Sequence, residues 1–296
     1  LYGLPEDHRR SGRRTERWLM YTSTAPVYSP KNLSEALELR QAHPAATVLA
    51  GGTDVMVSIE TGALDPTEVL NIWGCQELRQ IQSNEHSGAV RIGALTTWTD
   101  IVHHADIPDA LRECAQTIGA QLIQNRGTVG GNIVNASPAG DSLPLWLALD
   151  ARFEVASVNG HRMVAAADFW KGYRTVDLAP NELLIAVHID DNSDDHLHYR
   201  KVGTRLAQAI SKVVLGGCIR IQDGVVKEAR IALGSVAPVP MRLPSVEAAL
   251  LGKPVDPSAA DHVISDIAPI DDIRSTASYR SRVATRIVRS WLDTLA

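Results

Sequence analysis

The sequence has few cysteines, no long hydrophobic run and no excess of positive charge. Cys75, Cys114 and Cys218 lie far apart in 296 residues, which argues against a disulfide framework and against a Cys-x-x-Cys metal or iron–sulfur site in this chain. No apolar run approaches the roughly 18 residues of a membrane span, and no basic start leads into an apolar signal core. The net charge of −5 gives no reason to expect a nucleic-acid partner. We therefore expect a soluble, cytoplasmic protein.

Several catalytic and metal-binding signatures are also missing. No stretch matches the G-x-x-x-x-G-K-[ST] of a P-loop or the G-x-G-x-x-G of a dinucleotide-binding unit. Among ten histidines, only His103–His104 and His196–His198 lie close together, and no third ligand is in phase with either pair. Neither a Gly-x-Ser-x-Gly turn nor a pair of catalytic carboxylates stands out. The sequence thus predicts no catalytic side chain and no metal site, and any redox chemistry belongs to a bound cofactor.

The length of 296 residues favours two or three compact units. Strands and helices alternate from Tyr21 to about Asp190, with Ser34 predicted to cap the first helix and Asp54–Ile59 predicted as a helix or a buried strand. The acidic run Asp190–Asp195 is interpreted as a linker or a hairpin tip. Antiparallel strands, with a hairpin signal at Asp223–Gly224, and then helices follow it.

The first 20 residues differ from the rest of the chain. They contain a cluster of arginines without helical apolar spacing: Arg9, Arg10, Arg13, Arg14 and Arg17. We interpret Leu1–Met20 as a solvated tail. The alternative is a basic arm that lies along an acidic partner.

The strongest functional signal is the stretch Asn125–Asp141, which combines a glycine pair with a flanking hydroxyl, asparagines and a closing carboxylate. The pair Gly130–Gly131 permits positive φ and close approach of the backbone to a ligand. Thr128 and Asn132 add side-chain donors beside the freed backbone N–H groups of this stretch, which suits an anionic oxygen such as a phosphate. Asp141 is an acceptor when ionised, and a ribose hydroxyl is its natural donor.

Two further stretches add to this signal. Leu49–Asp54 repeats two glycines, a hydroxyl and a carboxylate, although taken alone it fits a structural turn. Two such loops in one chain indicate a long diphosphate ligand that is held from two sides. In Tyr199–Ser211, Lys201 stands where a strand ends, and the alternative reading is a surface lysine on an edge strand.

Taken together, these stretches resemble the FAD-binding medium subunit of the molybdenum hydroxylases, the family of xanthine dehydrogenase and carbon monoxide dehydrogenase. The resemblance covers roughly Tyr21 to Ala296. Its motifs follow the family's order: Ala50–Asp54, Ile92–Thr97, Asn125–Asp141, Tyr199–Lys201, Ala237–Arg242 and Asp272–Arg280.

The resemblance implies an α/β plus α+β fold. A two-subdomain FAD-binding domain of the vanillyl-alcohol-oxidase/PCMH type would span residues 21–190, divided into about 21–75 and 76–190. A C-terminal domain like that of the carbon monoxide dehydrogenase flavoprotein would span 193–296, and residues 1–20 would form the basic tail.

The resemblance also implies the cofactor contacts. The two glycine stretches would hold the pyrophosphate of FAD, Asp141 the adenosine ribose, Leu184 the adenine end, and Lys201 would lie near the flavin ring. Ile118 occupies a position where several family members stack an aromatic ring on the flavin. The full set of predicted FAD-binding residues is Leu49, Ala50, Gly51, Gly52, Thr53, Asp54, Thr97, Ile118, Thr128, Val129, Gly130, Gly131, Asn132, Asp141, Leu184 and Lys201.

The function implied is that of an electron-transfer subunit. A small partner with two [2Fe–2S] clusters and a large partner with the molybdenum cofactor would complete a heterotrimer, which would pair into a dimer of heterotrimers. Electrons would pass from the clusters through FAD to NAD or another acceptor. The segment Asn135–Asp141 looks closer to the xanthine dehydrogenase version, which favours a purine-oxidising complex. Two alternatives stay open: a self-contained FAD-dependent oxidoreductase of the same fold, and a structural subunit that has lost FAD.

Overall fold

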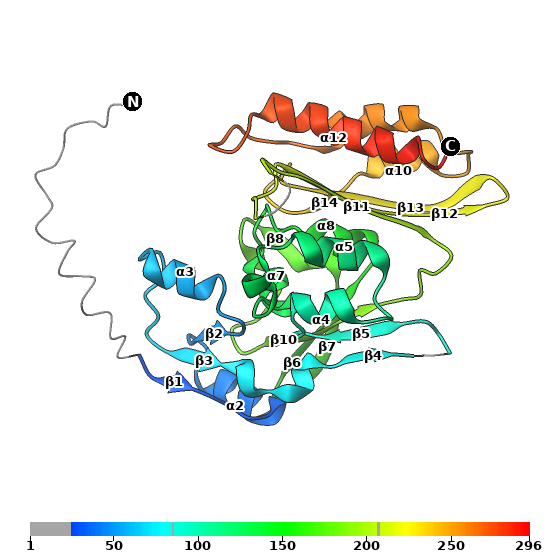
Figure 1. Cartoon of the computed structure of the whole chain (residues 1–296). Helices are drawn as coiled ribbons and strands as arrows, with labels where there is room; N and C mark the ends of the chain where they lie inside the picture. Colours follow the sequence, from blue (N-terminus) through cyan, green and yellow to red (C-terminus); the bar gives the residue numbers. More distant parts are fainter. Residues whose placement is uncertain (1–24, 85, 206–207) are drawn as a thin grey trace, which may run out of the picture.

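The computed structural model describes residues 25–84, 86–205 and 208–296. The basic segment Leu1–Met20 lies outside these residues, so its interpretation stays a prediction. Within them, three main sheets follow one another along the chain, and helices cover each of them (Figure 1). None of the described helices is long and apolar enough to cross a membrane.

The first sheet is small and parallel, and its strand order is β1-β3-β2. Two helices connect its strands, as parallel pairing requires. The second of these helices carries no buried residue, which decides between the helix and the buried strand predicted there. The elements are β1 (Val27–Tyr28), α2 (Leu33–Ala42), β2 (Thr47–Leu49), α3 (Val55–Glu60) and β3 (Val69–Asn71).

The start of α2 corrects one prediction. Asn32, rather than Ser34, is the N-cap, and its side-chain oxygen accepts a hydrogen bond from the N–H of Glu35 at 2.9 Å. Asparagine and serine cap helices about equally well, so local propensity could not choose between two candidates two residues apart.

The second sheet has the order β4-β5-β10-β6-β7, and all its pairs are antiparallel. The predicted alternation of strands and helices is right, but it does not produce a parallel sheet, because β10 returns between β5 and β6 and a tight turn joins β6 to β7. The strands are β4 (Ile81–Ser83), β5 (Val90–Gly93), β6 (Arg152–Ser157), β7 (Gly160–Ala165) and β10 (Leu183–Ile189), with a small separate pair, β8 (Trp170–Gly172) and β9 (Thr175–Val176). The helices are α4 (Trp98–His103), α5 (Asp109–Thr117), α6 (Gln121–Gln124), α7 (Val129–Asn135), α8 (Leu143–Ala148) and α9 (Ala166–Phe169).

The third sheet is the predicted antiparallel unit, in the order β11-β12-β13-β14. Its central hairpin turns at Asp223–Gly224, as predicted, and both residues have positive φ, 54° and 70°. Helices cover the outer face of this sheet, at the top of Figure 1. The elements are β11 (His196–Val202), β12 (Val213–Gln222), β13 (Val225–Gly234), β14 (Met241–Arg242), α10 (Pro244–Leu250), α11 (Val263–Asp266) and α12 (Ala277–Leu292).

The inner face of the third sheet packs on α8, so that the two parts of the chain share one core. Val214 and Ala232 belong to the same buried cluster as the α8 side chains. Gly216 on β12 makes the approach possible, because a Cβ there would lie only 2.7 Å from the Cα of Leu145. The C-terminal sheet is therefore held firmly against the residues that precede it. The domain limits at residues 75, 190 and 193 remain our proposal, which the separate sheets support.

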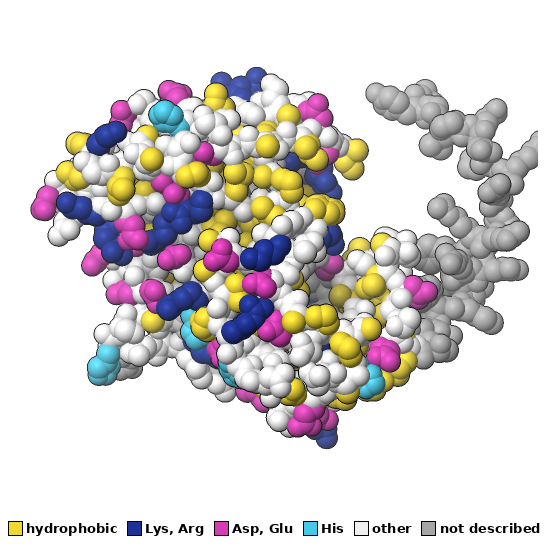
Figure 2. Space-filling model, turned by 180° about the vertical axis from the view of Figure 1, so that it is seen from behind, with side chains coloured by type: hydrophobic (Ala, Val, Ile, Leu, Met, Phe, Trp, Pro, Cys, Tyr) yellow, Lys and Arg dark blue, Asp and Glu magenta, His cyan; other side chains and the backbone are white. Residues whose placement is uncertain are grey.

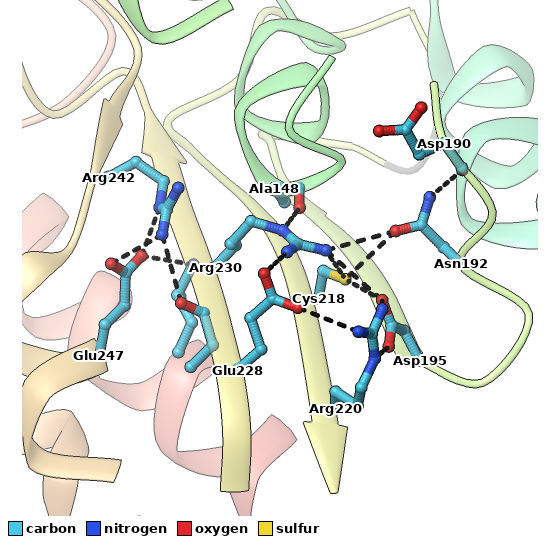
Figure 3. Close-up of polar contacts among 12 residues, drawn as sticks. Ala148, Asp190, Asn192, Asp195, Cys218, Arg220, Glu228, Arg230, Arg242 and Glu247 are labelled. Carbon is cyan, nitrogen blue, oxygen red and sulfur yellow. Dashed lines mark hydrogen bonds and ion pairs between the residues drawn. The ribbon is translucent and has the colours of Figure 1, made fainter. Parts of the chain in front are cut away.

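An ionic cluster around the buried carboxylate of Asp195 fastens the segment between β10 and β11 to the third sheet (Figure 3). Arg230 donates from Nε to the carbonyl of Ala148 at 2.8 Å and lies 3.4 Å from Asp195, whose side chain is fully buried. Arg220 donates to the other oxygen of Asp195 at 2.7 Å. Burial acts to raise the pKa of Asp195, but the bond from Arg220 and the charges of both arginines bring it below the ordinary value. The run Asp190–Asp195 is a linker between two sheets, and its last residue is anchored rather than loose.

Candidate functional site

The two glycine stretches, Leu49–Asp54 (the first) and Asn125–Asp141 (the second), lie in direct contact. A Cβ on Gly51 would be 1.7 Å from the carbonyl oxygen of Arg126, so no side chain fits between the two backbones. The side chain of Arg126 turns back to the first stretch and donates from Nε to the carbonyl of Gly51 at 3.4 Å. A second link runs from Asn135, at the end of α7, to Asp54 at 3.1 Å. The two stretches therefore form a single site.

The first stretch supplies free backbone donors. The N–H groups of Gly51, Gly52, Thr53 and Asp54 make no hydrogen bond to any residue that the structure describes. Gly52 has a φ of 80°, a conformation that glycine adopts without strain. Consecutive unpaired N–H groups in such a turn are a common arrangement for binding an anion.

The second stretch differs from our expectation of free backbone donors. The four N–H groups from Val129 to Asn132 donate within the chain, to Thr96, Ala94 and, twice, Thr128. That part of the prediction is wrong, because the turn uses these groups to cap α7 and to attach it to the end of β5. The sequence could not show this, since two of the acceptors lie more than 30 residues away in the chain.

Side chains of the second stretch keep donors of their own. The Thr128 hydroxyl accepts from the N–H of Gly131 at 3.1 Å, which leaves its own hydrogen to be donated. The oxygen of the Asn132 amide accepts from Ser142 at 2.7 Å, and its nitrogen donates to no described residue. A Cβ on Gly131 would meet only the Thr128 hydroxyl within 4 Å, so the space beside this backbone is open.

A recess lies between the lobe that carries α3 and the rest of the molecule, as Figure 2 shows. The first stretch leads directly into α3, whose lobe borders this recess. Backbone donors on one side, with a hydroxyl and an amide on the other, fit an elongated diphosphate.

Lys201 and Asp141 form a buried ion pair. The lysine Nζ is 2.7 Å from one carboxylate oxygen and donates to the carbonyl of Thr117 at 2.9 Å, with the two side chains 9% and 13% exposed. The second oxygen of Asp141 accepts from the Ser211 hydroxyl. Burial raises the pKa of Asp141, although the charge and bond of Lys201 and the bond of Ser211 oppose the rise. The alternative of a surface lysine is therefore wrong.

Three further predicted residues are buried within the FAD-binding part of the chain. Thr97 caps α4 and pairs by a β-bridge with Thr128, while Ile118 and Leu184 are buried at 8% and 5% exposure. Their contacts with FAD stay predictions, as do those of the predicted set apart from one pair of roles. Asp141 and Lys201 lie 2.7 Å apart, so they cannot serve the adenosine ribose and the flavin ring, which stand on opposite sides of the FAD diphosphate. Both oxygens of Asp141 are taken by Lys201 and Ser211, so we keep the role of Lys201 and withdraw the ribose contact of Asp141. Sequence reasoning missed Ser211, which lies 70 residues from its partner Asp141, so no local pattern could have paired them.

Comparison with known proteins covers nearly the whole chain. Residues 20–190 match the family model described as "FAD binding domain in molybdopterin dehydrogenase", and residues 198–295 match "CO dehydrogenase flavoprotein C-terminal domain". The xanthine dehydrogenase FAD-binding subunit of Escherichia coli O157:H7 is 31% identical over 267 residues, which cover 86% of this chain and 90% of the relative. The carbon monoxide dehydrogenase medium chain of Hydrogenophaga pseudoflava is 30% identical over 279 residues, 90% of this chain and 95% of the relative.

Solved structures agree with these relatives. Carbon monoxide dehydrogenase from Hydrogenophaga pseudoflava superposes with a TM-score of 0.87 at 29% identity, covering 92% of this chain and 96% of that one. Quinoline 2-oxidoreductase from Pseudomonas putida 86 gives 0.85 at 25% identity, with coverage of 93% and 98%. The predicted fold class, an FAD-binding domain followed by a flavoprotein C-terminal domain, is confirmed, and so is FAD as the cofactor of this chain. The chain belongs to the family of FAD-binding subunits of the molybdenum hydroxylases, which are oxidoreductases.

Proposed function

We propose that this chain is the electron-transfer subunit of a molybdenum hydroxylase and passes electrons from the [2Fe–2S] clusters of a small partner to NAD or another acceptor. A large partner carries the molybdenum cofactor, and two such heterotrimers form a dimer. The observation that carries the proposal is the close contact between the two glycine stretches. One stretch has the unpaired N–H groups of Gly51–Asp54, and the other has the free side-chain donors of Thr128 and Asn132. Bound FAD supplies the redox chemistry, which no side chain at this site offers.

The chain's own residues bind and orient the cofactor. The two stretches hold the diphosphate through the free N–H groups of Gly51–Asp54 and the side chains of Thr128 and Asn132. Lys201 places a positive charge where we expect the flavin ring, and a fixed charge of this kind stabilises negative charge that develops nearby. Asp141 and Thr117 hold the lysine ammonium in position.

We propose a purine as the substrate of the complex. The support is the segment Asn135–Asp141, which resembles its counterpart in xanthine dehydrogenases. Overall identity does not favour one substrate, because the names of relatives between 30% and 33% identical refer to xanthine, glyceraldehyde, carbon monoxide and nicotinate.

The test is the visible spectrum of the protein purified from its source, with the co-purifying chains identified by mass. We expect flavin and iron–sulfur absorbance, one smaller and one larger companion, and anaerobic bleaching by xanthine or hypoxanthine. A lone chain whose flavin is bleached by a small substrate would instead support a self-contained flavoenzyme. A colourless, folded protein would support a subunit without FAD.

Gly131→Val should abolish retention of FAD. The branched side chain would begin 2.7 Å from the Thr128 hydroxyl and extend into the open space beside the backbone, where we place the diphosphate. The ratio of flavin to protein after gel filtration is the measurement. A normal ratio would contradict our assignment of this stretch.

Lys201→Met should leave FAD bound and change its reduction potential, because the charge near the ring is lost. It should also destabilise the protein, by about 3–5 kcal/mol, because the carboxylate of Asp141 stays buried with Ser211 as its remaining side-chain partner. The double variant Lys201→Met/Asp141→Asn should regain much of that stability while its potential stays altered. An unchanged flavin reduction potential in both variants would show that Lys201 does not act on the flavin.

A further inference from the structure

A tryptophan held between two arginines borders the first glycine stretch. The guanidinium carbons of Arg79 and Arg126 lie 3.8 Å and 3.7 Å from the centre of the Trp73 ring. Two planar groups so close to one ring centre would overlap on the same face, so they cover opposite faces. Such contacts hold a guanidinium in one place and orientation.

The two arginines differ in the use of their donors. Arg79 donates to the backbone carbonyl of Trp73 at 2.7 Å, so one of its terminal nitrogens is already used within the chain. Burial is the main cause that lowers its pKa, and the charge of Arg126 lowers it further, while Asp100 opposes both effects. The carboxylate of Asp100 binds the N–H and hydroxyl of Thr97, and no carboxylate of the described residues bridges the two arginines. The two positive charges therefore repel each other across the ring.

The terminal nitrogens of Arg126 remain free to donate hydrogen bonds. Its Nε contacts the carbonyl of Gly51 at 3.4 Å, and neither terminal nitrogen donates to a described residue. The carbonyl that holds it belongs to the stretch whose N–H groups are unpaired. A fixed, exposed cation thus stands beside four free backbone donors, and a guanidinium can give two parallel hydrogen bonds to a phosphate.

We propose that Arg126 binds the diphosphate of FAD and that Trp73 positions its guanidinium for this contact. This inference rests on the proposed function and adds a residue to its site. Neutral N–H groups stabilise the diphosphate but leave its negative charge uncompensated, and Arg126 supplies a positive charge at the first glycine stretch. The bound anion also relieves the repulsion between Arg126 and Arg79.

The test compares ligands with and without a diphosphate. The wild-type protein and the Arg126→Gln variant are both purified with flavin and then freed of it. Each is titrated with FAD, ADP and riboflavin. Loss of a charge-assisted contact should weaken FAD and ADP about 10- to 100-fold and leave riboflavin within about twofold. Arg286→Gln, which removes an exposed charge on α12, is the matched control and should change none of the three. Trp73→Leu should weaken FAD and ADP less than Arg126→Gln does, because the cation remains but is no longer fixed.

The outcomes separate this inference from the proposed function. Unchanged affinity for FAD and ADP in Arg126→Gln would overturn it, and so would an equal loss for riboflavin, which would indicate a structural role. Wild-type protein that binds neither FAD nor ADP would refute the proposed function itself. Should the variant fail to fold, the wild type provides the readout: ADP, but not adenosine, should protect Arg126 from an arginine-specific dicarbonyl reagent. Absence of that protection would also overturn the inference.

Discussion

Gly51→Ala should release FAD and destabilise the protein strongly. The new Cβ would lie 1.7 Å from the carbonyl oxygen of Arg126 and 2.6 Å from its carbonyl carbon, so the two backbones must separate. Overpacking against adaptable side chains costs about 1–3 kcal/mol, and a backbone obstacle should bring the loss to the upper end of that range or beyond. The measurements are the flavin-to-protein ratio and the midpoint of urea unfolding.

Gly172→Ala is the matched control for this prediction. Its Cβ would meet only Thr175 at 4.0 Å, and its φ is not positive, so the free energy of unfolding should change by less than about 1 kcal/mol. Full flavin content and normal stability in Gly51→Ala would show that the two stretches are not in the tight contact that defines the site.

Arg230→Met should cost about 3–5 kcal/mol of the free energy of unfolding. The methionine fills most of the space but leaves the carbonyl of Ala148 without its donor and removes one of the two arginines from the buried carboxylate of Asp195. Because this cluster joins β13 to α8 and to the linker, we expect the C-terminal sheet to loosen from the FAD-binding part. Urea unfolding followed by tryptophan fluorescence measures the loss.

Arg289→Met provides the comparison on the surface. Its partner is Asp261, the two side chains are 43% and 65% exposed, and such a pair is worth less than about 1 kcal/mol.

The pH dependence of stability adds a second readout for Arg230→Met. Since the pKa of Asp195 is lowered in the folded protein, its contribution is present above the unfolded value of about 3.9 and is lost as the pH falls through the folded value. Arg230→Met should weaken this acid dependence, and equal losses of stability in both arginine variants would contradict the role of the cluster around Asp195.

Features that depend on neighbouring residues could be predicted from the sequence. The hairpin at Asp223–Gly224 follows from the ease with which these residues take positive φ. The cap of α2 was misplaced by two residues, because Asn32 and Ser34 are equivalent by propensity. The antiparallel order of the second sheet was not predictable, because β10 pairs with β5 and β6 across long separations in the chain.

The sequence by itself determined the family, the cofactor and the two glycine stretches, because residue type and local order carry all three. Only the tertiary structure decided which donors at the site are free. It showed that the N–H groups of Val129–Asn132 are already used, whereas those of Gly51–Asp54 are not. It also brought Ser211 and Lys201 to Asp141 and set Arg126 against Gly51. The physical reason is that a hydrogen bond depends on which groups meet in space, and these partners lie 60 to 75 residues apart in the chain.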